Sequence, residues 1–379
     1  MPTPSLRTDG LLVAPLVVGI CGTDLQILRN HRSDTAAILG HEGMATVLAA
    51  GIDGCGFQAG DTVIFNPVNP RNQAEILGHS CDGLMQERRW VSASELAWGL
   101  VVQAEVSDLD PLLGALVEPL AAVLYGFELV GQAVAMQTVA VIGAGPAGLL
   151  AVLSAQDLGA AQVLLITNSQ RRRQWVANRG ILPARFVLVA GEENLAAAVS
   201  QRLAGRKLDA AFLCTPRTAA TSMLESILPA LRQGGCTDLL GGFADGDCIT
   251  ALPGLDLNSV RRANVCGIPQ PGIVAERVCA DGKRIHVTGH RGTALRHLAL
   301  AQTVLSQAAD RYGCVITHRC SLNAAPEMLA QLLGRTRARA FDQAEFVKGV
   351  IDFRLAGHVV ETANADWKYQ EQREVNNEP

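Results

Sequence analysis

The chain has 379 residues, a formal net charge of -4, and 49% apolar against 18% charged side chains. This length predicts two domains, and the apolar content is sufficient for a folded core, which excludes a globally disordered chain. Positive and negative charges are interspersed, so the sequence lacks the basic surface typical of a nucleic-acid-binding protein. We therefore expect no nucleic acid partner.

The ten cysteines contain no Cys-x-x-Cys pair, and residues 1–15 lack a basic start followed by a clean apolar run. A core of this size needs no disulfide framework, which favours a reduced, cytoplasmic protein without a signal peptide. The stretch between Glu128 and Asp157 carries no charge, as a membrane span would require. Its four glycines and Pro146 divide it into a strand, a turn and a helix, so we expect no membrane span.

In chain order, the first part of the sequence predicts short β-strands. The runs "GLLVAPLVVGI", "GMATVLAAG" and "GDTVIF" are β-rich and bounded by glycine or aspartate. From about residue 137, strands alternate with helices: "TVAVIGAG", "PAGLLAVLSAQDLG", "AQVLLIT", "NSQRRRQWVANRG", "LDAAFLCT" and "CTDLLGGF". This alternation predicts an α/β domain with a doubly wound parallel sheet and helices on both faces. The polar end of the chain, "NADWKYQEQREVNNEP", is expected to fray.

A glycine loop follows the first buried strand of the α/β region and opens a helix. It reads Gly143-x-Gly145-Pro146-Ala147-Gly148. The first glycine permits a tight turn, the second lets a pyrophosphate approach the backbone, and the third lets helix and strand pack closely. The helix N-terminus adds free N–H groups for the phosphates. The loop therefore predicts a dinucleotide site.

The turn after the next strand indicates which dinucleotide binds. An NAD site usually has an acid there, but Thr167 occupies the place, and no Asp or Glu occurs between Asp157 and Glu192. We expect Thr167, Asn168, Ser169 and Arg171 to bind the 2′-phosphate of NADP, with NAD as the second choice. Arg172 and Arg173 fit a solvated helix face.

Cysteine, histidine and acidic residues in two short motifs predict a metal site. "GICGTD" holds Cys21, and "LGHEG" holds His41 and Glu42. A catalytic zinc takes about three N, S or O ligands and keeps one position open, and Glu42 or Glu118 can supply the oxygen. We predict one catalytic zinc.

The motifs "GICGTD", "LGHEG", "GDTVIF", "LVEPLAAVLYG" and "VAVIGAGPAG", in this order, resemble the zinc-dependent medium-chain dehydrogenase/reductase family. The resemblance covers residues from about 10 to about 353. It implies a GroES-like, β-rich catalytic domain formed by residues 1–119 and 288–379, and a Rossmann dinucleotide-binding domain at 120–287. It places the active site in the cleft between the two domains.

The resemblance also assigns roles to individual residues. Cys21 and His41 match zinc ligands, and Glu42 matches an acid beside the metal. Glu118 matches a position that is cysteine in simple alcohol dehydrogenases and glutamate in the polyol and threonine dehydrogenases. Thr23 matches a hydroxyl proton relay. The histidine that often continues this relay is replaced by Gln26, so nearby His31 is the candidate substitute, with a surface histidine as the alternative.

The sequence departs from the family in the region that often holds a structural zinc. Four cysteines are usual there, whereas this chain has Cys81 alone, so no structural zinc is expected. The opening of the catalytic domain before Cys21 is short. His290 and Arg291 match a loop facing the nicotinamide, with Arg291 a candidate contact for a phosphate or a polar substrate. His79 is a further candidate for substrate contact.

Together these features predict an NADP-preferring, zinc-dependent dehydrogenase acting on the secondary alcohol or ketone of a small polar substrate. Polyols, cyclitols, sugars and amino alcohols all remain open. Two alternatives use the same fold: a zinc-free, NADPH-dependent reductase of activated double bonds, and a non-catalytic binding protein. The resemblance implies a homodimer or homotetramer.

Overall fold

The computed structural model describes residues 9–52, 56–106, 109–191, 194–267, 272–334, 340–341 and 344–363. The chain divides into two compact units, unit 1 (Met1–Ala121 and Leu295–Pro379) and unit 2 (Ala122–Ala294). The domain boundaries expected from the sequence fall after residues 119 and 287, whereas the two units are divided after residues 121 and 294. The tail that we expect to fray lies outside the described residues.

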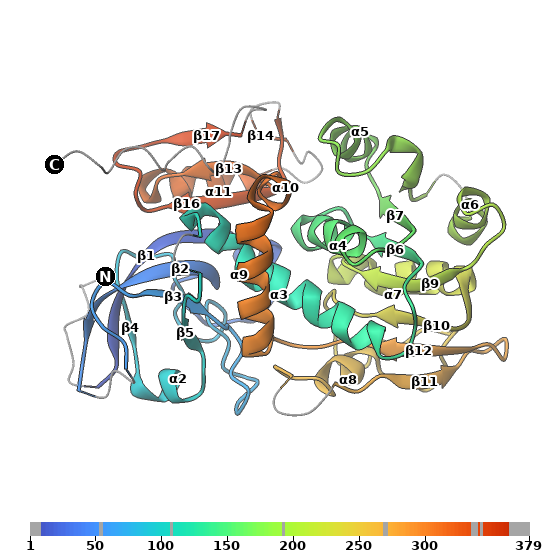
Figure 1. Cartoon of the computed structure of the whole chain (residues 1–379), viewed down its shortest axis with the longest axis horizontal. Helices are drawn as coiled ribbons and strands as arrows, with labels where there is room; N and C mark the ends of the chain where they lie inside the picture. Colours follow the sequence, from blue (N-terminus) through green and yellow to red (C-terminus); the bar gives the residue numbers. More distant parts are fainter. Residues whose placement is uncertain are drawn as a thin grey trace. The chain divides into compact units, whose positions relative to one another are not determined.

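Unit 2 contains the predicted Rossmann sheet. Its strands follow the order β11-β12-β10-β9-β6-β7-β8, and every pair is parallel except the edge pair β11–β12. Figure 1 shows these strands beside one another, with the connecting helices packed around them. The five residues of β6 and all but the first of β7 are buried, which explains their unbroken apolar sequence.

The elements of unit 2 match the predicted alternation of strands and helices. Its strands are β6 (Thr138–Ile142), β7 (Gln162–Thr167), β8 (Val187–Val189), β9 (Leu208–Leu213), β10 (Leu231–Asp238), β11 (Ala275–Val278) and β12 (Arg284–Thr288). Its helices are α4 (Pro146–Asp157), α5 (Gln170–Asn178), α6 (Leu195–Arg202), α7 (Arg217–Ile227) and α8 (Leu257–Arg262), with short 3-10 turns η1 (Ala184–Phe186) and η2 (Leu228–Ala230).

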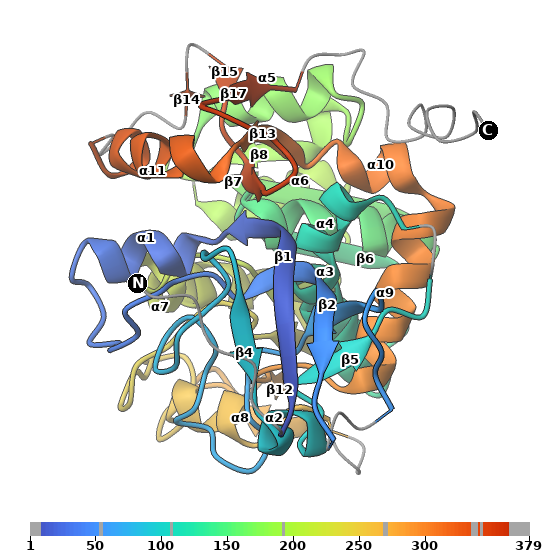
Figure 2. The same ribbon diagram turned by 90° about the vertical axis from the view of Figure 1, so that its left-hand side faces the viewer.

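Unit 1 is built on a β-rich sheet, as the GroES-like prediction requires. The strand order is β17-β13-β16-β1-β2-β3-β5, and β4 also pairs with β1. Figure 2 shows β1 at the front with β4 and β2 on either side of it. A core of apolar side chains from β1, β2 and β3 packs beneath these strands, including Leu11, Val47 and Phe65.

The elements of unit 1 come from both ends of the chain. Its strands are β1 (Leu11–Ile20), β2 (Glu42–Ala50), β3 (Thr62–Phe65), β4 (Arg89–Val91), β5 (Val101–Gln103), β13 (Ile316–Cys320), β14 (Ala340–Phe341), β15 (Ala344–Glu345), β16 (Lys348–Asp352) and β17 (Val360–Thr362). Its helices are α1 (Gly22–Leu28), α2 (Ala93–Ala97), α9 (Leu295–Gln307), α10 (Ala309–Gly313) and α11 (Ala325–Gly334), with the 3-10 turn η3 (Leu322–Ala324).

Helix α3 (Pro111–Gly131) begins in unit 1 and ends in unit 2. Among the described residues it is the one helix whose length and composition would allow it to cross a membrane, and 83% of its apolar window is buried in the fold. The uncharged stretch at 128–157 is divided among the end of α3, strand β6 and helix α4, as predicted.

Candidate metal and coenzyme sites

Cys21 lies at the junction between a strand and a helix. Strand β1 ends at Ile20, Cys21 keeps an extended backbone (φ -95°, ψ 155°), and α1 begins at Gly22. The carboxylate of Asp24 accepts a hydrogen bond from the Cys21 N–H at 2.8 Å, which caps the first turn of the helix. The motif "CGTD" therefore fixes the backbone that presents the thiol.

His41 and Glu42 reach the same place from the start of β2. Gly40 before them has φ +92°, and a Cβ there would meet Met85 and Val18 side-chain carbons at 2.8 Å, so glycine is required. Possible ligand atoms of Cys21, His41 and Glu42 all lie within 4.8 Å of one another, the one such group among the described residues. Sulfur, nitrogen and oxygen donors at this spacing fit a zinc ion.

Asp24 also faces the imidazole of His41. Its Oδ1 lies 3.7 Å from His41 Nδ1, and neither atom has a hydrogen-bond partner among the described residues. Asp24 is fully buried. A buried carboxylate beside a metal-binding histidine orients the ring and raises its basicity. The two orphaned atoms thus support the fit of the site to a metal.

The charges around Cys21 favour a metal as well. Burial raises the pKa of the Cys21 thiol, the charge of Asp24 raises it further, and the ammonium of Lys348 opposes both. Lys348 on β16 forms an ion pair with Glu42. Burial lowers the pKa of Lys348 to about 8, and the negative charges of Cys21 and Asp24 oppose this. A divalent cation would favour the thiolate that the protein alone disfavours.

Glu118 lies on α3, half-buried, outside the group of three donors. Burial raises the pKa of its carboxyl group, and nearby His41 opposes this. Its carboxylate is thus close enough to His41 to interact electrostatically. Glu118 remains a candidate third ligand beside Glu42.

His79 packs against His41. The two rings meet edge to face, with centroids 4.7 Å apart and planes at 85°. His79 is 7% exposed, its Nδ1 lies 3.7 Å from Asp34, and neither ring nitrogen has a hydrogen-bond partner among the described residues. Burial, followed by the positive charges of His41 and Arg32, lowers the pKa of His79 to about 3. The ring is therefore a neutral hydrogen-bonding group beside the proposed metal site.

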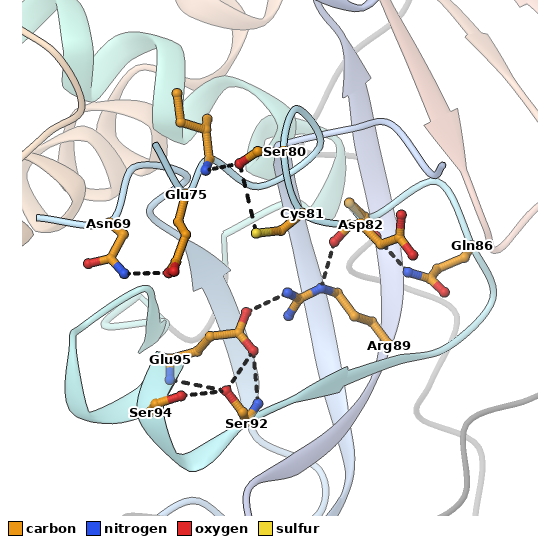
Figure 3. Close-up of polar contacts among 12 residues, drawn as sticks. Asn69, Glu75, Ser80, Cys81, Asp82, Gln86, Arg89, Ser92, Ser94 and Glu95 are labelled. Atoms are coloured by element: carbon orange, nitrogen blue, oxygen red, sulfur yellow. Dashed lines mark hydrogen bonds and ion pairs between the residues drawn. The ribbon is translucent and has the colours of Figure 1, made fainter. Parts of the chain in front are cut away.

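The segment around His79 lies in the region where the family often has four cysteines and this chain has Cys81 alone. Polar contacts hold it together (Figure 3): Asn69 donates to Glu75, the hydroxyl of Ser80 accepts the N–H of Ile76, and Arg89 forms an ion pair with Glu95. The carboxylate of Asp82 also accepts hydrogen bonds from the N–H groups of residues 37 and 38. These contacts seat the segment, with His79, against the loop that carries His41.

The two residues predicted to move protons lie apart. The hydroxyl of Thr23 is 3.7 Å from Cys21 Sγ and therefore at the metal cluster. His31 is exposed in the turn after α1, where its N–H donates to the carbonyl of Gln26. Its ring makes no hydrogen bond with the described residues. The structure brings Thr23 to the metal cluster and leaves His31 at the surface.

The glycine loop in unit 2 has the geometry that a dinucleotide requires. Gly143 has φ +109°, and a Cβ on Gly148 would lie 1.8 Å from the carbonyl oxygen of Gly143, so neither position tolerates a side chain. Beside Gly145 there is open space. Pro146 and Ala147 begin α4, whose N-terminus faces this space. The cradle fits a pyrophosphate.

The turn after β7 contains the residues predicted to select the coenzyme. Thr167 is 3% exposed, and its hydroxyl has no hydrogen-bond partner among the described residues. Asn168 and Arg171 are exposed, whereas Ser169 caps α5 by accepting the N–H of Arg172 at 3.2 Å. The hydroxyl hydrogen of Ser169 is not used by this bond and can be donated to a ligand.

The expectation that Arg172 lies on a solvated helix face is wrong. Arg172 is 1% exposed, and its guanidinium donates to the carbonyl of Ala144 in the glycine loop. It also lies 5.8 Å from the ring centroid of Trp175. The first turn of α5 packs toward the glycine loop, so position 172 points inward while position 171 points outward. Arg173 is half-buried and donates to the carbonyl of Ala184.

His290 and Arg291 follow β12 in unit 2. His290 is buried with its ring 4.5 Å from that of Tyr125. Arg291 is half-buried and donates to the side-chain oxygen of Asn258 at 2.7 Å. Its guanidinium is thus tied to α8.

Sequence reasoning missed three residues of these sites. The sequence does contain a local signal for Asp24. It stands three residues after Cys21, the N-cap residue of α1, and an acid at this position is typical of a capping box. The sequence does not distinguish Arg172 from the arginines on either side of it. Lys348 lies 306 residues from its partner Glu42. No local pattern identifies a partner at that separation.

Comparison with known proteins places the chain in a family. Residues 7–100 match the family described as Alcohol dehydrogenase GroES-like domain. The sorbitol dehydrogenase of Bombyx mori is 28% identical over 45% of this chain and 53% of its own length. The glucose 1-dehydrogenase 2 of Vulcanisaeta moutnovskia is 30% identical over 84% of this chain and 88% of its own length.

Solved structures support the same fold. A zinc-binding dehydrogenase from Sinorhizobium meliloti 1021, bound to NADP, superposes with a TM-score of 0.70 at 23% identity, over 93% of this chain and 94% of that one. The two units match the GroES-like and Rossmann fold classes, and they contain the cysteine–histidine–glutamate cluster and the glycine cradle described above. The chain therefore belongs to the zinc-dependent medium-chain dehydrogenase/reductase family of NAD(P)-dependent oxidoreductases.

Proposed function

We propose that this enzyme uses one zinc ion per chain to interconvert a secondary alcohol and a ketone in a small polar substrate, with NADP favoured over NAD. The observation that carries the proposal is the cluster of half-buried Cys21 with buried His41 and Glu42, whose donor atoms lie within 4.8 Å of one another. A reductase of activated double bonds that works without zinc has no use for this cluster. A non-catalytic binding protein would not need both this cluster and the glycine cradle.

The chain's own residues suit the chemistry of an alcohol. When bound, the zinc supplies a Lewis acid for the substrate oxygen and the nicotinamide supplies the hydride chemistry. Cys21, His41 and one carboxylate, from Glu42 or Glu118, would hold the metal. The hydroxyl of Thr23 lies beside Cys21 and can take the proton of the substrate alcohol. His31, exposed to water, is a candidate for the outer end of this relay.

Three observations favour a substrate rich in hydroxyl groups. A carboxylate ligand makes zinc a weaker Lewis acid, which a chelating diol can offset. His79 offers a neutral imidazole without a hydrogen-bond partner among the described residues. The relatives named above act on sorbitol and glucose, as their names state. We include polyols, cyclitols, sugars and amino alcohols in the proposal.

The turn after β7 supports NADP. A 2′-phosphate needs hydrogen-bond donors and cations, and a carboxylate would repel it. Thr167, Asn168, Ser169 and Arg171 provide donors and a positive charge there, and the described part of this turn has no acidic side chain. We further propose a homodimer or homotetramer in the reducing cytoplasm. The nine cysteines that the structure describes are free thiols, which is compatible with that compartment.

Metal analysis and a substrate screen test the proposal together. Protein purified without chelators should contain about one zinc per chain, which is the ratio that one three-ligand site predicts. The same protein should oxidise at least one polyol, sugar or amino alcohol with NADP as coenzyme. Protein that reduces activated double bonds without zinc would show that the alternative reductase function is the right one, and zinc without any turnover would favour a binding protein.

A further inference from the structure

Asp238 is a buried acid that the zinc and coenzyme sites described above do not use. It is the last residue of β10, which lies between β9 and β12 in the sheet of unit 2 (Figure 1). The side chain is 0% exposed, and neither carboxylate oxygen accepts a hydrogen bond from the described residues. A buried polar group without such a partner lowers stability, so its presence calls for an explanation.

Three titratable side chains interact electrostatically with Asp238. They are Arg261 of α8, Cys214 after β9 and Cys236 on β10. Burial raises the pKa of both thiols far above their usual range, and the charge of Asp238 raises it further, so both thiols stay neutral. The other neighbouring elements contribute uncharged residues, namely Gly126 of α3, Phe212 of β9 and Thr288 of β12. Among the described residues, Arg261 is therefore the charged group that acts on this carboxyl.

Asp238 lies close to the residues that form the glycine cradle. Cys214 interacts electrostatically with Asp238, and a Cβ on Gly143 of the cradle would lie 2.4 Å from the carbonyl oxygen of Cys214. A Cβ on Gly241, three residues after Asp238, would lie 2.6 Å from the carbonyl oxygen of Thr215. The loops after β9 and β10 thus meet beside the cradle. Three fully extended residues span at most about 11 Å, which limits the distance from Asp238 to this place.

Strand β10 belongs to the half of the sheet expected to bind the nicotinamide. In a doubly wound sheet, the dinucleotide lies across the carboxyl ends of the strands where the strand order reverses, with one nucleotide over each half. Here the order reverses between β6 and β9. The turn after β7, which we expect to bind the adenosine ribose, lies on one side of this point. The carboxyl end of β10, with Asp238, therefore lies on the nicotinamide side.

We propose that Asp238, when ionised, stabilises the oxidised nicotinamide ring relative to the reduced ring, and so makes the redox preference of the coenzyme site depend on pH. The oxidised ring carries a positive charge that the reduced ring lacks. Asp238 acts on this charge through space and touches neither coenzyme nor substrate. This inference rests on the coenzyme site proposed above. It does not depend on the choice between NADP and NAD, which differ at the adenosine ribose.

The size of the effect follows from the charge and its titration. Burial raises the pKa of Asp238 to about 7, and the positive charge of Arg261 opposes the rise. The carboxyl is therefore largely protonated and uncharged at pH 5.5 and largely ionised at pH 8.5. At the effective dielectric constant of a protein interior, two unit charges about 10 Å apart change an equilibrium by about tenfold. The preference for NADP+ over NADPH should rise by this factor between the two pH values.

Dissociation constants of NADP+ and NADPH for the full chain, measured by calorimetry from pH 5.5 to pH 8.5, test the proposal. The constant for NADPH divided by that for NADP+ should rise about tenfold in wild type and stay level in Asp238→Asn. The phosphates are the same in both forms, so their titration cancels in this ratio. Asp281→Asn, which removes an exposed acid, is the matched control and should behave as wild type. A level ratio in wild type, or a rise that persists in Asp238→Asn, would overturn the inference.

Arg261 provides a second test if Asp238→Asn does not fold. Arg261→Gln removes the charge that opposes the rise in the pKa of Asp238, so the change in the ratio should move to higher pH. Arg261→Lys keeps the charge and should leave it near the wild-type pH. An unmoved change in Arg261→Gln would show that another group titrates and would overturn the inference.

A comparison with NAD+ and NADH separates this inference from the proposed coenzyme choice. The same rise with NAD+ and NADH would support the role of Asp238 even in a wild type that prefers NAD. A wild-type protein that binds neither coenzyme in either form would refute the coenzyme site itself, and the inference with it.

Discussion

Asp238 offers a quantitative test of the structure in the coenzyme-binding unit. It ends β10 and is fully buried, and neither carboxylate oxygen has a hydrogen-bond partner among the described residues. A Cβ on Gly126 of α3 would lie 3.0 Å from Asp238 Oδ2. The groups that interact with it electrostatically are Arg261 on α8 and the thiols of Cys214 and Cys236. We predict that Asp238→Asn stabilises the protein above pH 7.

The magnitude follows from the pKa of this carboxyl group. Burial raises it from 3.8 to about 7, although the positive charge of Arg261 opposes the rise. The difference, 7 - 3.8, corresponds to about 4 kcal/mol at about 1.4 kcal/mol per pKa unit. The asparagine amide would itself lack partners, which costs about 1–3 kcal/mol. We therefore expect a net gain of about 1–3 kcal/mol in the free energy of unfolding at pH 8.

The sign of the pH dependence is fixed by the same shift. Between about pH 4 and pH 7 the folded protein keeps the proton of Asp238 while the unfolded chain has released it. The contribution of Asp238 protonation to the free energy of unfolding is therefore fully present below pH 3.8. It falls as the pH rises toward 7 and is absent above 7. The advantage of Asp238→Asn should accordingly be largest at pH 8 and disappear near pH 5.

Urea unfolding of wild type and variant at pH 5, 6, 7 and 8 measures this difference. Asp281→Asn, which removes the same charge from an exposed turn, is the control and should show no comparable trend. A variant that is less stable than wild type at pH 8 would refute the reasoning. So would an advantage that does not shrink toward pH 5, because the native carboxylate would then be ionised and well paired.

The remaining predictions concern the two sites. Cys21→Ala should abolish turnover but leave coenzyme binding, measured by calorimetry, nearly intact, since the glycine cradle lies in unit 2; near-normal activity would rule out the zinc mechanism. Thr167→Asp should reverse the preference for NADP, and Arg171→Ala should weaken NADP about ten- to hundredfold while hardly changing NAD, because a charge-assisted hydrogen bond contributes about 1.5–3 kcal/mol. A wild type that binds NAD more tightly would contradict both. Arg172→Ala should weaken both coenzymes, because this side chain supports the carbonyl of Ala144; a loss confined to NADP would argue against that role.

Several features of this protein were determined by local sequence. A strand followed by Gly143-x-Gly145-x-x-Gly148 forms the expected cradle, because the turn and the close helix approach depend on the missing side chains of those residues. Cys21 and His41 also lie close together, since Cys21 directly follows one strand and His41 directly precedes a neighbouring strand of the same sheet. Periodicity and motif spacing describe such arrangements because they involve neighbouring strands and tight turns.

Other features were decided by tertiary structure alone. Lys348 stands 306 residues from Glu42, and only the placement of β16 beside β1 brings its ammonium to the metal cluster. Arg171 and Arg172 look alike in the sequence, but packing of α5 buries one against the glycine loop and exposes the other. The raised pKa of Asp238 likewise depends on its burial beneath α3. Charge pairing and desolvation depend on distances in space, which the order of residues along the chain does not specify.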